Sequence, residues 1–279
     1  MLFSRLSRPA RISALALATA GSLTWCAAQA LARELPVDLE LVLAVDVSGS
    51  VDEVEARLQR DGYVQALRHP DVISAISAGV LRRIAVTYIE WAGQDTQSVV
   101  LDWRLIDSKA AANAFASELE RVEITRGRYT SISQAIRYAL PRFVGNGFDG
   151  TRRVIDVSGD GANNTGGLVN VARDEAVAMG VTINGLPIVN GRPNRFGQQL
   201  PDLDLYYRNC VIGGPGAFIV VAQDFESFAR AVRKKLVLEI AAAPGPALPA
   251  DRSLLVRAAA EGPPCDAGEN RLRRMFMDP

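Results

Sequence analysis

The hydrophobic pattern divides the chain beyond residue 36 into segments of two alternating types. Short runs rich in Val, Ile and Leu predict strands at Val37–Val45, Ile84–Trp91, Ser98–Leu105, Arg153–Val157, Val181–Ile188 and Ala217–Val221. Longer stretches with apolar residues at helical spacing predict helices at Val51–Leu67, Lys109–Val122, Ser131–Phe143, Leu168–Met179 and Phe225–Leu238. This alternation predicts a doubly wound α/β fold, in which helices cover both faces of a mostly parallel sheet.

One pair of strands departs from this alternation. Ile84–Trp91 and Ser98–Leu105 are separated only by the loop Ala92–Gln97, which is too short for a helical crossover. We therefore expect this pair to be antiparallel, with one reversed strand at an edge of an otherwise parallel, Rossmann-like sheet. The long connection Asn190–Asn209 has no assigned element, and connections of this length are either functional or mobile.

The first residues have the composition of a targeting segment. Three arginines at positions 5, 8 and 11 precede the apolar stretch Ile12–Trp25, and Ala30-Leu31-Ala32 then provides small residues for cleavage. Residues 1–32 are therefore predicted to be a cleaved signal peptide, and the apolar stretch is short for a membrane span. We expect a periplasmic or secreted protein with no stable membrane insertion.

The mature chain then consists of a globular domain over residues 36–240 and an Ala/Pro-rich linker with a tail over residues 241–279. Removal of residues 1–32 leaves 28 Lys and Arg against 31 Asp and Glu, a net charge of −3. This balance argues against a nucleic-acid partner. Two cysteines remain, Cys210 and Cys265, and such a pair in an exported protein favours a disulfide that ties the tail to the domain.

Polar residues follow the first predicted strand, at Asp46, Ser48 and Ser50. Turn chemistry explains them in part, because Ser50 and Glu53 fit a capping box at the start of the next helix. Thr130, however, precedes a later helix, and Asp160 follows the strand that begins at Arg153. Since ligands bind where the carboxyl ends of parallel strands meet, these residues are expected at one edge of the sheet.

The five side chains offer two carboxylates and three hydroxyls. Such hard oxygen donors suit Mg²⁺, with Mn²⁺ or Ca²⁺ as alternatives, better than zinc or copper. Asp156 is a poorer candidate because it lies inside the apolar strand. Asn163 and Asn164 are interpreted as loop residues, and the basic patch of Arg271, Arg273 and Arg274 as a solvated surface, with a partner contact as the second interpretation.

The pattern Asp-x-Ser-x-Ser, the later threonine and the distal aspartate resemble the metal-ion-dependent adhesion site (MIDAS) of a von Willebrand factor A (VWA) domain. The resemblance covers about Val37 to Leu238. It implies that Asp46, Ser48, Ser50, Thr130 and Asp160 hold a divalent cation and that an acidic side chain of a partner protein completes its shell. One departure is Ser158-Gly159-Asp160-Gly161, where the family commonly has Thr-Asp-Gly.

The resemblance further implies an exported adhesion or assembly module of a little-characterised bacterial group, with an unknown protein partner. Two alternatives are a protein whose metal only stabilises the fold and a Mg²⁺-dependent hydrolase. We expect no enzyme, because the one histidine, His69, is remote from the expected edge and no nucleophile–base set is visible. A nucleotide-binding Rossmann domain would require Gly-x-Gly-x-x-Gly after the first strand, where the chain reads DVSGSVD.

Overall fold

The computed structural model describes residues 34–191, 199–225, 227–241 and 262–277. The expected signal peptide, residues 1–32, and most of the Ala/Pro-rich linker lie outside the described residues. Within the described ranges, no helix combines the length and the apolar character needed to cross a membrane.

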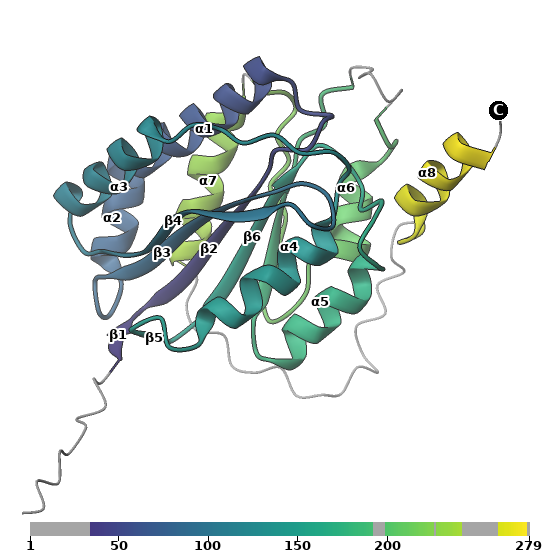
Figure 1. Cartoon of the computed structure of the whole chain (residues 1–279). Coiled ribbons are helices and arrows are strands. Elements are labelled where there is room, and N and C mark those ends of the chain that lie inside the picture. The colour runs from purple at the N-terminus through teal and green to yellow at the C-terminus, as the bar shows by residue number, and fades with distance from the viewer. Residues whose placement is uncertain (1–33, 192–198, 226, 242–261, 278–279) are drawn as a thin grey trace, which may run out of the picture. The chain divides into compact units, whose positions relative to one another are not determined.

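A five-stranded sheet forms the centre of the domain (Figure 1). Its order is β4-β3-β2-β6-β7, with bounds Gln97–Ile106, Ile84–Trp91, Leu39–Asp46, Arg153–Gly159 and Thr182–Pro187. Strands β2, β3, β6 and β7 are parallel, and β4 pairs antiparallel with β3 at the edge, which confirms the predicted fold class. Two short strands, β1 (Leu35–Val37) and β5 (Phe148–Gly150), pair separately.

The prediction of a strand at Ala217–Val221 is wrong, because this segment forms no continuous ladder with β7. This segment contacts β7 through one isolated bridge, Gly185 with Ile219, and a second bridge joins Ile188 to Ala222 just beyond the two segments. The backbone amide of Phe218 donates to the side chain of Asn184 at 3.0 Å instead of to a backbone carbonyl. The polar side chain of Asn184 thus interrupts the pairing that the apolar pattern suggested.

Helices cover both faces of the sheet, as predicted (Figure 1). One face carries α1 (Glu53–Arg68), α2 (Pro70–Ala78), α3 (Lys109–Arg121) and α7 (Phe228–Ala241). The other carries α4 (Ile132–Ala139), α5 (Val169–Ala178) and the short α6 (Leu203–Tyr206), which continues as a π-helical turn, Tyr207–Val211. A final helix, α8, spans Ala267–Met277.

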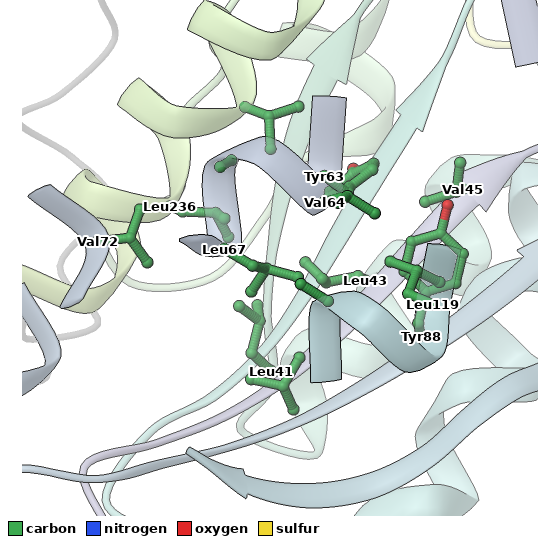
Figure 2. Close-up of a cluster of buried hydrophobic side chains, with 14 of the residues drawn as sticks. Leu41, Leu43, Val45, Tyr63, Val64, Leu67, Val72, Tyr88, Leu119 and Leu236 are labelled. Carbon is green, nitrogen blue, oxygen red and sulfur yellow. The ribbon is translucent and has the colours of Figure 1, made fainter. Parts of the chain in front are cut away.

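The alternation of side chains along β2 divides the core into two clusters. Its odd-numbered residues face the side of α1, where Figure 2 shows Leu41, Leu43 and Val45 beside Tyr63, Val64 and Leu67. Its even-numbered residues Val42 and Ala44 pack with α4 and α5 on the other face. Both faces of β2 are therefore buried, as its continuous apolar run predicts.

Three helix boundaries differ from expectation. The capping box of α1 is formed by Asp52 and Glu55, whose side chains accept from each other's backbone amides, and not by Ser50 and Glu53. The helix expected over Ser131–Phe143 ends at Ala139 and continues as a 3-10 turn, since Pro141 removes a backbone donor. α2 was not expected, and His69 both ends α1 and caps α2 by accepting from the amide of Asp71.

A buried charged cluster joins α7 to the sheet. The ammonium of Lys235 contacts the carboxylates of Asp156 on β6 and Glu239 on α7, and Glu239 also accepts from the side chain of Asn184 at 2.9 Å. All three charged side chains are at most 1% exposed. Burial and the charge of Glu239 raise the pKa of Asp156 to about 7, although Lys235 opposes this shift.

The predicted disulfide is present. Cys210 in the π-helical turn is bonded to Cys265, just before α8. It links residues 55 positions apart and ties the C-terminal segment to the domain, as the sequence predicted.

Candidate metal-binding site

The loop that follows β2 places three of the predicted ligands. Asp46 is the last residue of the strand, and its carboxylate accepts from the backbone amide of Ser48 at 2.7 Å. This bond folds the chain back so that the hydroxyls of Ser48 and Ser50 lie 3.0 Å apart. Because the helix cap is supplied by Asp52, the hydroxyl of Ser50 does not cap the helix and donates elsewhere.

Thr130 reaches the same edge on the loop between α3 and α4. The buried pair of Arg60 and Glu90 holds the start of this loop, because Glu90 also accepts from the amide and hydroxyl of Thr125. The amide of Gly127 then donates to the carbonyl of Val47 at 3.0 Å, beside the loop after β2. Thr130 arrives with its hydroxyl 3.4 Å from that of Ser48.

Asp160 follows β6 and completes the group. One of its carboxylate oxygens accepts from the hydroxyl of Ser50 at 2.6 Å, across 110 positions of sequence. Its backbone carbonyl accepts from the side chain of Gln199 at 2.7 Å. The structure therefore brings together all five residues predicted from the sequence: Asp46, Ser48, Ser50, Thr130 and Asp160.

The two carboxylates of this group are placed where their charges are unfavourable. Asp46 is fully buried, and burial followed by the charge of Asp160 raises its pKa well above the usual value. Burial also raises the pKa of Asp160 to about 6, although the hydrogen bond from Ser50 opposes the shift. Two buried acids whose ionised forms are both disfavoured make a site that favours an added positive charge.

A buried oxygen atom without a hydrogen-bond partner indicates whether a cation fits this group of side chains. The second carboxylate oxygen of Asp46 has no hydrogen-bond partner among the described residues, although it is buried. Buried polar atoms in proteins normally have a hydrogen-bond partner, so this oxygen is available to coordinate a ligand. The described residues contain no group of three or more His, Cys, Asp or Glu side chains around one point. The donors are thus two carboxylates with three hydroxyls, a set that fits a hard divalent cation.

Gly159 and Tyr207 belong to the site but were not predicted. A side-chain carbon at position 159 would lie 2.9 Å from both the unpaired oxygen of Asp46 and the hydroxyl of Tyr207. The Tyr207 hydroxyl is buried without a partner among the described residues, and its pKa is raised by burial and by the nearby charges of Asp46 and Asp160. Tyr207 lies in the long connection to which no element was assigned, so no sequence pattern placed it.

Asn163 and Asn164 do more than the loop interpretation assumed. The side-chain oxygen of Asn164 accepts from the amide of Thr130, and that of Asn163 accepts from the amide of Ser133, both at 2.9 Å. These bonds fix the loop after β6 to the start of α4. The two asparagines therefore position Thr130 relative to Asp160.

His69 and Asp156 lie apart from this group. His69 is at the junction of α1 and α2, where its ring contacts the guanidinium of Arg233 at 2.8 Å. Asp156 lies inside β6 and pairs with Lys235. The chain has a single histidine, so no imidazole is among the candidate ligands.

Comparisons with known proteins agree with the fold. A family model described as a protein of unknown function (DUF1194) matches residues 36–244. No curated protein matches the sequence significantly. Proximal thread matrix protein 1 of the mussel byssus superposes with a TM-score of 0.53 at 17% identity, over 75% of this chain and 49% of that one. This chain therefore spans about half the length of that protein.

Two other solved structures are similar. The same mussel protein with a zinc-occupied MIDAS motif superposes with a TM-score of 0.51 at 14% identity, over 75% of this chain and 49% of that one. The pilus adhesin SpaC of Lactobacillus rhamnosus GG superposes with a TM-score of 0.50 at 12% identity, over 75% of this chain and 31% of that one. At these identities the similarity establishes a common fold, that of the VWA domain expected from the sequence.

Proposed function

Because the chain belongs to the DUF1194 family and has the fold of a VWA domain, we propose that it is a metal-dependent protein-binding module. A divalent cation would be held by Asp46, Ser48, Ser50, Thr130 and Asp160. A carboxylate of a partner protein would then bind to this cation. The observation that carries this proposal is the convergence of these five side chains at one edge of the sheet, where a buried oxygen of Asp46 has no hydrogen-bond partner among the described residues.

The donor set supports a small hard cation, and Mg²⁺ is the first candidate. The cation supplies a Lewis-acidic centre with a coordination position for an external oxygen, because Mg²⁺ is usually held by one or two carboxylates and keeps several positions for other ligands. The hydroxyls of Ser48, Ser50 and Thr130 contribute neutral donors, and Tyr207 and Gly159 close the buried side. The zinc-occupied MIDAS motif of the mussel protein supports cation binding by this fold.

The class of partner follows from the same chemistry. The three hydroxyls are neutral donors, so an external anion meets less electrostatic repulsion at the cation than it would beside additional carboxylates. An Asp or Glu side chain of a protein meets this requirement. The similarity to a thread matrix protein and a pilus adhesin supports a role in adhesion or assembly.

Binding is favoured over catalysis at this site. A hydrolase would require a general base near the cation, and the one histidine contacts Arg233 at the junction of α1 and α2. We therefore propose a binding protein and not an enzyme. Turnover of a phosphomonoester that disappears in Asp46→Ala would contradict this part of the proposal.

Export of the protein is supported by the disulfide. Disulfides persist in oxidising compartments and are rare in the cytosol. The bond between Cys210 and Cys265 therefore fits a periplasmic or secreted location. The expected signal peptide over residues 1–32 is consistent with this location.

A capture experiment tests the proposed function. The immobilised mature protein is incubated with a periplasmic extract in Mg²⁺ or in EDTA, with Asp46→Ala and the exposed-site control Asp95→Ala in parallel. We expect a partner that is retained in Mg²⁺ by the wild type and by Asp95→Ala, and that is lost in EDTA and in Asp46→Ala. Retention that is indifferent to EDTA and to Asp46→Ala would refute the mechanism. A metal-induced rise in melting temperature without any metal-dependent partner would instead favour a purely structural cation.

A further inference from the structure

A cavity of about 210 Å³ opens beside the candidate metal site. Three of the candidate ligands, Ser50, Thr130 and Asp160, line it. Leu272, Met275 and Phe276 of α8 line it as well. The C-terminal helix thus forms part of the wall of a recess that also contains these three candidate ligands.

Covalent and polar contacts hold α8 in this place. The disulfide of Cys265 with Cys210 fixes the residue before the helix to the π-helical turn that carries Tyr207. In the first turn of α8, the carboxylate of Glu269 accepts from the side chain of Asn163 at 2.6 Å. A side chain at Gly268 would clash with the backbone carbonyl of Asn163, so glycine permits this close approach. α8 is therefore attached to the loop that positions Thr130 and Asp160.

The surface that α8 adds is apolar and exposed. Phe276 is 74% exposed and Met275 47% exposed, and Tyr129, which also lines the cavity, is 44% exposed. Exposed apolar side chains gathered beside a polar site mark a surface for a partner. Arg128 and Arg271 also line the cavity and give it positive charge, which is complementary to an acidic ligand.

The size of the cavity limits what enters it. Pockets for drug-sized ligands measure about 300–1,000 Å³, and this one is smaller. It is large enough for a single large apolar side chain. An occupant that reaches both the metal site and the apolar wall must therefore present a carboxylate and such a side chain close together.

We propose that α8 is a specificity element for the metal site. The partner's Asp or Glu binds the cation, and a large apolar side chain within two positions of that acid enters the cavity against Leu272, Met275 and Phe276. This inference rests on the proposed function, and it adds a sequence preference that the metal site alone does not supply.

Peptide selection tests the proposal. A display library of random 12-residue peptides is bound to the immobilised mature protein in Mg²⁺ and eluted with EDTA, so that only metal-dependent peptides are recovered. We expect the wild type to select an Asp or Glu with Leu, Ile, Met, Phe or Trp within two positions. The double variant Met275→Ala/Phe276→Ala should keep the acid and lose the apolar preference. The control Met179→Ala/Leu238→Ala changes exposed apolar residues that do not line the cavity, and should select as the wild type does.

Affinities of one selected peptide complete the test. Replacing its apolar residue by alanine should weaken binding to the wild type about tenfold and to the Met275→Ala/Phe276→Ala variant less than twofold. Two results would overturn the role of α8 and leave the proposed function standing. In the first, the EDTA-eluted peptides carry an acid but show no apolar preference. In the second, the double variant selects the same apolar preference as the wild type. Recovery of no EDTA-eluted peptide would overturn the proposed function itself, and the role of α8 with it.

Discussion

At the scale of single residues, the two buried carboxylates of the candidate site lower the stability of the metal-free protein at neutral pH. Asp46 and Asp160 are both buried, and the pKa values of both carboxyls are raised, chiefly by burial. A raised pKa means that the folded protein favours the protonated acid more than the unfolded chain does. The resulting stabilisation is present below the ordinary aspartate pKa of about 4 and is lost as the pH rises through about 6.

Asp160→Asn should therefore stabilise the metal-free protein at pH 7.5. We expect the free energy of unfolding in EDTA to rise by about 1–3 kcal/mol, because the amide accepts from Ser50 without carrying a charge. The difference should shrink toward pH 4, where the wild-type acid is protonated. Addition of Mg²⁺ should stabilise the wild type but not the variant. Urea denaturation at both pH values measures this, with the exposed Asp95→Asn as control; equal stability of Asp160→Asn and wild type at pH 7.5 would contradict the assigned burial cost.

A second residue-scale prediction concerns Lys235. Lys235→Met leaves the carboxylates of Asp156 and Glu239 buried together without their cation, and breaking such a pair costs about 3–5 kcal/mol. The loss should be smaller at acidic pH, where Asp156, whose pKa is raised to about 7, binds a proton. The neighbouring exposed Lys234→Met should change stability by less than about 0.5 kcal/mol. Similar denaturation midpoints for the two variants would show that the cluster does not hold α7 as described.

The candidate metal ligands were predictable from the sequence, because the order of strands and helices places all of them at the same edge of the sheet. Asp46, Ser48 and Ser50 follow one strand, Asp160 follows another, and Thr130 precedes a helix at that edge. Tyr207 was not predictable in this way, because it enters from a connection whose π-helical turn has no periodic signature. Its role depends on long-range packing, which a local pattern does not encode.

At the scale of elements, the start of α1 separates helix capping from the candidate site. The sequence allowed Ser50 and Glu53 to form the capping box, but Asp52 and Glu55 form it two residues later. Both pairs satisfy the same spacing rule, so sequence alone did not distinguish them. The hydroxyl of Ser50 is consequently available to Asp160.

Two substitutions should separate these roles. Asp52→Ala should lower the free energy of unfolding by about 1 kcal/mol, as loss of an N-cap does, and leave Mg²⁺ affinity unchanged. Ser50→Ala should weaken Mg²⁺ binding while the helix cap stays intact. Calorimetric titration with Mg²⁺ and urea denaturation of both variants measure the two effects. A loss of Mg²⁺ affinity in Asp52→Ala as large as that in Ser50→Ala would show that capping and cation binding are not separable.

At the scale of the whole molecule, the C-terminal segment is part of the domain's binding edge. The fold class and the disulfide were predictable from alternating periodicity and from an even cysteine count in an expected exported chain. The place of α8 was not predictable, because its apolar side chains stay largely exposed and the helix is held instead by contacts of Cys265, Glu269 and Gly268. Single contacts of this kind leave no periodic trace in a sequence.

Removal of the disulfide should lower stability and leave cation binding largely unchanged. The variant Cys210→Ala/Cys265→Ala loses a cross-link over 55 positions, for which chain entropy gives a loss of about 4 kcal/mol. Mg²⁺ affinity should remain within about twofold, since neither cysteine is a candidate ligand. Thermal denaturation and Mg²⁺ titration measure these values. A large loss of Mg²⁺ affinity in a variant that is still folded would show that α8 contributes to the cation site itself.

The measurement that tests the central claim most directly is anomalous diffraction from crystals of the mature protein soaked in Mn²⁺. We expect one strong anomalous peak within contact distance of the hydroxyls of Ser48 and Ser50 and beside Asp160, and no such peak in crystals of Asp46→Ala. The absence of a peak at this edge in the wild type, with Mn²⁺ bound elsewhere or not at all, would contradict the account.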